Sequence, residues 1–456
     1  MSERKRETLA VGAATNSRIV RRSFIACLVA GILWIVAIPA FGQLDIEKPP
    51  IDYLRSKPND AISRLQARLK SGEVTLEREP HFGYLRSVLK TLDVPESSQV
   101  LVFSKTSLQI KYISPRSPRS IYFNDDVYIG WVQGGNIEVS AADPRLGANF
   151  YLFDQDELVR PRFDRQTFEC LQCHGSMLTR GVPGHMVRSV FTAPDGHQVA
   201  GAGSFLTDHD SPFSERWGGW YVTGDHGSLR HLGNLYVRRS DDPKRLDLEA
   251  GANARDLRRW IEPSTTLNGQ SDIVALMVLE HQASLHNRLT RANLIAQTAV
   301  HEEETSNREA GRPAEFRSAE FRRQMVEAAT PVVEHLLFAG ELKLTSPVRG
   351  YSGFSEQFAK RGPADRQGRS FRQFDLQTRL FKFPCSYLIY SESFDRLPPP
   401  VKEEVYRQLW AALTTTPVPS RFEHLSADDR AAIRDILSET KSDLPAYWKP
   451  AVASSP

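Results

Sequence analysis

Cysteine is scarce in this sequence. Its 456 residues contain four cysteines, at positions 27, 170, 173 and 385. Cys27 lies in an apolar N-terminal segment, and Cys170 and Cys173 are separated by two residues. If those two serve one site, Cys385 has no partner, which excludes a framework of intrachain disulfides. A structural zinc site normally needs four ligands, often from a second C-x-x-C pair, and no second pair is present.

An excess of charge of either sign is also absent. The chain has 58 Lys and Arg and 55 Asp and Glu, and residues 1–42 hold six of the basic and two of the acidic residues. The remainder therefore carries 52 basic and 53 acidic side chains. Nothing in this balance predicts a nucleic-acid partner.

The N-terminus has the layout of an export signal. Basic residues occur up to Arg22, an 18-residue apolar run extends from Phe24 to Phe41, and Ala40-Phe41-Gly42 is a small-x-small cleavage pattern. We expect residues 1–42 to be a signal peptide or an uncleaved membrane anchor formed by 24–41, because 18 apolar residues just suffice to span a bilayer. Either alternative places the rest of the chain in the periplasm or another extracytoplasmic compartment.

The most specific motif is Cys170-Leu171-Gln172-Cys173-His174, the C-x-x-C-H signature of c-type haem attachment. The two thiols add to the vinyl groups of the porphyrin, and the adjacent imidazole becomes the proximal iron ligand. A redox-active C-x-x-C pair and half of a zinc site are the alternatives. In an exported chain the motif favours one covalently bound haem c.

With Gly175 and the export signal, this motif resembles the c-type cytochromes. The resemblance covers the motif alone. It implies that Cys170 and Cys173 carry the thioether bonds, that His174 is the proximal ligand, and that the protein acts in electron transfer with an unidentified redox partner protein.

The pattern of apolar residues predicts an α+β fold, with a β-rich haem-bearing N-terminal half and a mainly α-helical C-terminal half. We expect a helical region over 43–98, a β-rich haem domain over 99–245 and a helical domain over 250–456. Residues 99–155 contain short β-branched and aromatic runs, among them Leu108–Ile113, and predict antiparallel strands. Helices are expected over 272–304, 318–339, 401–413 and 430–439.

The sixth iron ligand is expected from residues 185–234, where glycine, aromatic residues and histidine alternate. Met177 follows His174 by three residues, about 10 Å when extended, which is too short to pass around the porphyrin. Met277, Met325 and His281 lie on apolar helix faces and are interpreted as core residues. The candidates, in order, are His226, His231, His209, His185 and Met186.

Two further functions stay open. In a haem-dependent oxidoreductase, residues 185–234 would form a distal substrate pocket, with Trp217, Trp220 and Tyr221 in its wall. Arg216, Arg230 and Tyr221 are candidate partners for haem propionates or the distal pocket, since arginine pairs well with carboxylates. In a structural or binding protein, the motif would bind zinc instead.

Overall fold

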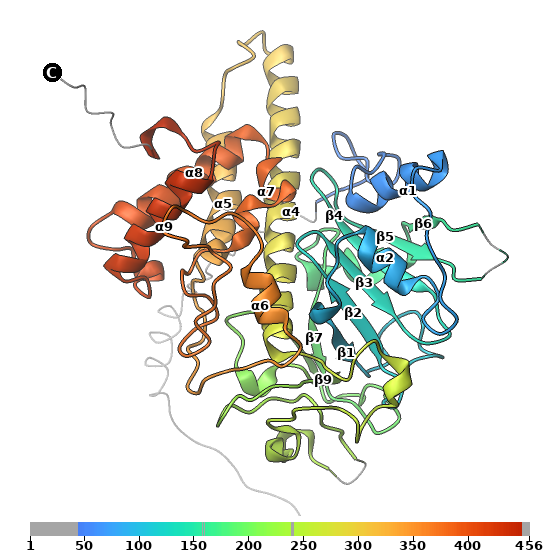
Figure 1. The fold of residues 1–456 in the computed structure, drawn as a ribbon. Helices are drawn as coiled ribbons and strands as arrows, with labels where there is room; N and C mark the ends of the chain where they lie inside the picture. Colours follow the sequence, from blue (N-terminus) through green and yellow to red (C-terminus); the bar gives the residue numbers. More distant parts are fainter. Residues whose placement is uncertain (1–43, 157, 159, 239–240, 449–456) are drawn as a thin grey trace, which may run out of the picture. The chain divides into compact units, whose positions relative to one another are not determined.

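A computed structural model describes residues 44–448, apart from 157, 159, 239 and 240 (Figure 1). The expected signal or anchor, residues 1–42, lies outside the described residues. Within them, the α+β prediction is confirmed: an antiparallel sheet occupies the N-terminal half, and the C-terminal half is mainly helical. No helix among the described residues is long and apolar enough to cross a membrane.

The main sheet has seven strands in the order β6-β5-β4-β3-β2-β1-β9, and every neighbouring pair is antiparallel. Strands β2 to β6 follow one another as a meander, because short turns connect them in sequence. The strands are β1 (Val100–Val102), β2 (Arg119–Phe123), β3 (Val127–Trp131), β4 (Ile137–Asp143), β5 (Gly147–Phe153), β6 (Phe163–Gln166) and β9 (Trp220–Tyr221). A separate hairpin pairs β7 (Arg188–Val190) with β8 (Ser204–Leu206).

One expected strand is wrong. Residues Leu108–Ile113 form turns, with Leu108 and Ile110 exposed. Side-chain bonds replace the strand ladder here: Ser107 Oγ accepts from the backbone N–H of Gln109, and Gln109 Oε1 accepts from that of Asn136. Such local bonds offer the backbone an alternative to pairing with a neighbouring strand.

The two faces of the sheet are covered by different helices. On one face, side chains such as Ile129 and Val139 pack with α1 (Ala61–Ser71) and α2 (Leu85–Thr91) in one apolar cluster. On the other face, Val102, Phe123 and Tyr128 belong to the large cluster that contains the C-terminal helices. Because successive strand residues point to opposite faces, the buried Ile137, Val139 and Ala141 of β4 pack in the cluster of α1 and α2, and the half-buried Glu138, Ser140 and Ala142 alternate with them.

The 37-residue helix α4 (Ile273–Glu309) is the centre of the large cluster. Asp272 caps its N-terminus by accepting from the backbone N–H groups of Val274 and Ala275. The remaining helices are α3 (Glu169–His174), α5 (Ala319–Leu336), α6 (Phe354–Ala359), α7 (Glu392–Asp395), α8 (Pro399–Thr414) and α9 (Ala427–Thr440). The large cluster draws on both halves of the chain, so the β-rich and helical parts share one core.

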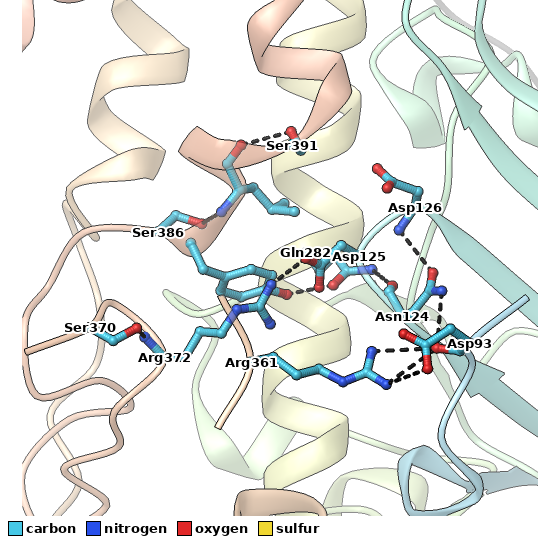
Figure 2. A network of polar contacts seen from close by, with 12 residues as sticks. Asp93, Asn124, Asp125, Asp126, Gln282, Arg361, Ser370, Arg372, Ser386 and Ser391 are labelled. Carbon is cyan, nitrogen blue, oxygen red and sulfur yellow. Dashed lines mark hydrogen bonds and ion pairs between the residues drawn. The ribbon is translucent and has the colours of Figure 1, made fainter. Parts of the chain in front are cut away.

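Polar contacts tie the sheet to the helical half (Figure 2). Gln282 of α4 donates to the carbonyl of Asn124, in the β2–β3 turn, over 2.7 Å. The next residue of that turn, Asp125, forms an ion pair with Arg372, and Arg361 donates to the carbonyl of Asp93. The Gln282 bond connects α4 to the β2–β3 turn, and the bonds of Arg372 and Arg361 connect the segment after α6 to Asp125 of that turn and to Asp93.

Candidate functional site

The C-x-x-C-H motif forms the short helix α3, three residues after the edge strand β6 ends. Cys170 is half-buried and Cys173 is exposed, and neither thiol is in a disulfide. Burial raises the pKa of Cys170 to about 11, and the nearby carboxylate of Glu138 adds to the effect. A redox-active C-x-x-C pair needs a lowered thiol pKa, so this environment counts against that alternative.

His174 is held in one orientation by the loop that follows. Its Nδ1 lies 2.9 Å from the carbonyl oxygen of Gly184, and the backbone N–H of Gly184 donates to the carbonyl of His174 over 2.8 Å. A carbonyl only accepts, so Nδ1 carries the proton and Nε2 keeps its lone pair. Burial lowers the pKa of His174, which favours the neutral ring that binds metals.

Gly184 allows this contact because it has no side chain. A Cβ there would lie 2.2 Å from Oδ1 of Asn287, a residue of α4. Asn287 in turn brackets the next residue: its Oδ1 accepts from the N–H of His185 over 2.8 Å, and its Nδ2 donates to the carbonyl of His185 over 2.7 Å. The chain is therefore fixed on both sides of the carbonyl that orients His174.

We expect Gly184→Ala to lower the free energy of unfolding by about 1–3 kcal/mol, because Asn287 must move to admit the methyl group. Chemical denaturation measures this loss. Gly269→Ala is the matched control, since a Cβ there would meet no atom within 4 Å and Gly269, like Gly184, has no left-handed φ. An equal loss in both variants would contradict the steric explanation.

The surroundings of the motif fit a flat apolar group. Phe168, Met177 and Leu178, which lie within four residues of the motif in sequence, expose 70%, 81% and 39% of their surface. Large apolar side chains exposed together usually mark a binding site. Phe150 of β5 packs against the ring of His174 at 4.8 Å between centroids. Two thiols, one oriented neutral imidazole and this apolar surface together form the donor set and the contact area that haem c requires.

Arg119 and Glu138 form the charged part of the neighbourhood. They make an ion pair of 2.6 Å on the same face of the sheet and interact electrostatically with Cys170 and His174. Sequence reasoning did not single out Arg119, which meets Glu138 because β2 and β4 both pair with β3.

Four of the five candidate sixth ligands are histidines that are buried and hydrogen-bonded. His226 and His231 lie 3.2 Å apart through their Nε2 atoms, and His226 Nδ1 donates to the carbonyl of Leu229. His209 Nδ1 lies 2.9 Å from Nδ1 of His281 on α4. These three rings are engaged with one another or with α4, and no contact that the structure describes joins them to His174.

His185 and Met186 lie closer to the motif. The ring of His185 interacts electrostatically with that of His174, but it is buried between Tyr128, at 4.3 Å between centroids, and Ser140. Met186 is the one candidate that is partly exposed. The sixth ligand therefore stays a prediction with five candidates.

The candidate propionate partners are all engaged elsewhere in the protein. Arg216 forms a buried ion pair with Glu280 at 3.1 Å. Arg230 pairs with Glu249 at 2.7 Å, and the Tyr221 hydroxyl lies 2.6 Å from that of Tyr236.

Sequence reasoning missed the residues that support the motif. Gly184 acts through its backbone, and the side-chain amide of Asn287 holds the neighbouring His185 backbone from about 100 residues away in the sequence. No local pattern marks such contacts. It also missed the grouping of His209 with His281 and His335, whose ligand nitrogens lie within 4.8 Å of one another. The sequence signal that could have indicated this cluster is one histidine on the apolar face of each of two successive helices, His281 on α4 and His335 on α5.

Comparison with known proteins gives no match, whether with protein-family models, with curated proteins or with solved structures. The function is therefore argued from the site alone.

Proposed function

We propose that this protein is an exported c-type cytochrome that carries one haem and acts in electron transfer. Cys170 and Cys173 hold the haem through thioether bonds, and His174 is the proximal ligand. The observation that carries the proposal is the reciprocal pair of hydrogen bonds between His174 and Gly184. Iron-ligating histidines characteristically donate their second ring N–H to a backbone carbonyl or carboxylate, which fixes the tautomer and raises the basicity of the ligand.

Haem c supplies a one-electron couple between ferric and ferrous iron when it is bound. The role of this chain is to hold that iron in a constant environment. The Nδ1–H of His174 donates to Gly184, so the imidazole cannot rotate between the two oxidation states. Phe150 packs against the same ring and limits access of water to it. Little rearrangement between the two states is what an electron carrier needs.

Zinc at the motif is less well supported. Among the described residues, the group of three or more side chains that could hold a metal is His209, His281 and His335, which does not include Cys170 or Cys173. A structural zinc site requires about four ligands, so the motif would have to recruit ligands that do not lie beside it.

The second candidate function is a haem-dependent oxidoreductase with a distal pocket in residues 185–234. That segment contains the partly exposed Met186 and four buried histidines, His185, His209, His226 and His231, and these candidate pocket residues keep this function open. Cyanide or azide binding to the ferric protein separates the two functions. A low-spin spectrum that neither anion changes is expected for the carrier, and a high-spin spectrum with ready cyanide binding would favour the enzyme.

Covalent haem attachment tests the proposal directly. The purified wild-type protein is expected to contain one haem per chain that acid-acetone does not extract, measured as the pyridine haemochrome and by haem staining of a denaturing gel. The double variant Cys170→Ala/Cys173→Ala removes both thioether bonds and is expected to lose all covalent haem.

Cys385→Ala is the matched control, because Cys385 is fully buried in the core cluster and away from the motif. It is expected to keep one covalent haem per chain. The proposal fails if the wild-type protein releases its haem on extraction, or if the double variant retains it.

A further inference from the structure

Three histidines meet in the core on the side of α4 that faces α5. His209 comes from the segment after β8, His281 from α4 and His335 from α5. They expose 4%, 0% and 3% of their surface. Each offers a ring nitrogen within 4.8 Å of the other two. A buried imidazole loses its hydration, so three together need a compensating interaction.

The outer nitrogens of all three rings are bound to oxygen atoms. His209 Nε2 lies 3.4 Å from the carbonyl of Ala339, and His335 Nε2 lies 3.3 Å from the carbonyl of His281. Both carbonyls can only accept, so both rings are protonated at Nε2 and have a lone pair at Nδ1. His281 Nε2 lies 2.8 Å from Oγ of Ser386.

The proton on His281 decides what the cluster can bind. With His209 Nδ1 as an acceptor, the 2.9 Å contact between the two Nδ1 atoms requires that His281 Nδ1–H donates, and the Ser386 hydroxyl then donates to His281 Nε2. Moving that proton from Nδ1 to Nε2, with a turn of the Ser386 hydroxyl, leaves all three Nδ1 lone pairs free. No proton has to leave the protein for this change.

We propose that His209, His281 and His335 bind one divalent transition-metal ion through their Nδ1 atoms, separately from the haem site. Neutral imidazoles suit Zn²⁺, Cu²⁺ and Ni²⁺, and three histidines with an open fourth position form a known type of zinc site. The oxygen partners of the His209 and His281 Nε2 atoms supply the outer shell that orients metal-binding histidines.

The distances require a small rearrangement. Two nitrogens 2.9 Å apart fit a metal–nitrogen bond of about 2.0–2.1 Å at an angle near 90°, and a tetrahedral angle needs about 3.4 Å. The His335 ring stacks on those of His209 and His281, at 4.2 and 4.9 Å between centroids. It must turn about its Cβ–Cγ bond to direct Nδ1 at the ion, and that torsion has a broad energy minimum in histidine.

The neighbouring charges are paired. Asp208 precedes His209, interacts electrostatically with His209 and His281, and lies 3.6 Å from Arg288. The carboxylate of Glu280 is paired with Arg216. The three ligands carry no charge, so the carboxylate that offsets the charge of the ion is Asp208, which the ion would share with Arg288.

Metal content tests the proposal. The haem-loaded protein is treated with a chelator, dialysed against Zn²⁺ or Cu²⁺ and analysed by mass spectrometry. We expect one Zn²⁺ or Cu²⁺ per chain in addition to the haem iron. His335→Gln and His209→Gln each remove one ligand and are expected to weaken binding by about 100-fold or more, as measured by titration calorimetry.

His286→Gln is the matched control, since His286 is also buried on α4 but pairs with Tyr128 outside the cluster. It is expected to bind the ion as the wild type does. Pulsed electron paramagnetic resonance of the Cu²⁺-loaded wild type adds a test that needs no variant, and coupling to imidazole nitrogen is expected. The proposal is overturned by a wild type that binds no ion, by Cu²⁺ without imidazole coupling, or by ligand variants that fold and bind the ion as the control does.

Discussion

For the cytochrome proposed above, replacing His174 with alanine is expected to leave the haem covalently attached and to abolish the low-spin spectrum expected of the wild type. Cys170 and Cys173 still hold the porphyrin, but the iron loses the imidazole that Gly184 keeps in position. Absorption and magnetic circular dichroism spectra of both oxidation states measure the change. Added imidazole is expected to restore a low-spin spectrum, because it can occupy the space that the ring has left.

His301→Ala is the control for this variant. His301 lies on the exposed part of α4, so its removal is expected to leave the spectrum unchanged. An unchanged spectrum in His174→Ala itself would assign the proximal ligand to another residue, even if the thioether bonds were confirmed.

The largest effect on stability is expected from Arg216→Met. The guanidinium is 3% exposed, forms an ion pair with the fully buried Glu280, and donates to the carbonyls of His209 and Ser211. Its removal leaves the buried carboxyl group without its charge partner, so that the group takes up a proton, and it leaves two carbonyls without their donor. Removing one partner of a buried ion pair typically destabilises a protein by about 3–5 kcal/mol. Guanidinium denaturation at pH 8 measures the loss.

The loss of stability in Arg216→Met is expected to increase with pH. Burial raises the pKa of Glu280 to about 7, against the opposing effect of Arg216, so in the variant it rises further. Below pH 7 Glu280 is mostly protonated in both folded proteins, and the two stabilities depend on pH in the same way. Above pH 7 the wild-type carboxyl ionises beside Arg216 while the variant keeps its proton. The difference between the two free energies of unfolding should therefore grow from pH 6 to pH 8.

Two further variants identify which interaction of Arg216 causes the loss of stability. Arg230→Met breaks an ion pair whose acid, Glu249, is 69% exposed, and it is expected to cost less than about 1 kcal/mol. Adding Glu280→Gln to Arg216→Met removes the carboxyl group that takes up the proton, and it should recover the pH-dependent part of the loss. A pH-independent loss that Glu280→Gln does not reduce would show that the backbone hydrogen bonds of Arg216 matter more than the ion pair.

Local patterns predicted the helices well. The apolar residues from Val274 to Leu289 recur at helical spacing after Asp272, and α4 begins at Ile273 with Asp272 as its cap. Ser426 likewise caps α9. Helix formation depends on neighbours three and four residues apart, so the sequence contains most of the information. The strand expected at Leu108–Ile113 fails because strand pairing depends on a distant partner that this segment does not find.

In the candidate site, too, local sequence patterns identify some residues, and contacts between distant segments determine the others. The thiols and His174 are contiguous, and their spacing alone identifies them. The group that orients His174 is a backbone carbonyl, and Asn287, which supports it, lies more than 100 residues away in the sequence. The sequence order of His209, His281 and His335 likewise gives no sign that their rings meet, because the packing of α4 against α5 brings two of them together.

Helix α4 carries residues of both proposed sites. His281 belongs to the three-histidine cluster, and Asn287, six residues or about 9 Å further along the axis, fixes the loop that orients His174. A continuous helix is stiff, so a shift of His281 on ion binding displaces Asn287 with it. Thermodynamic linkage then applies in both directions. If the bound ion changes the equilibrium between the ferric and ferrous forms of the haem by some factor, the two forms must differ in their affinity for the ion by the same factor.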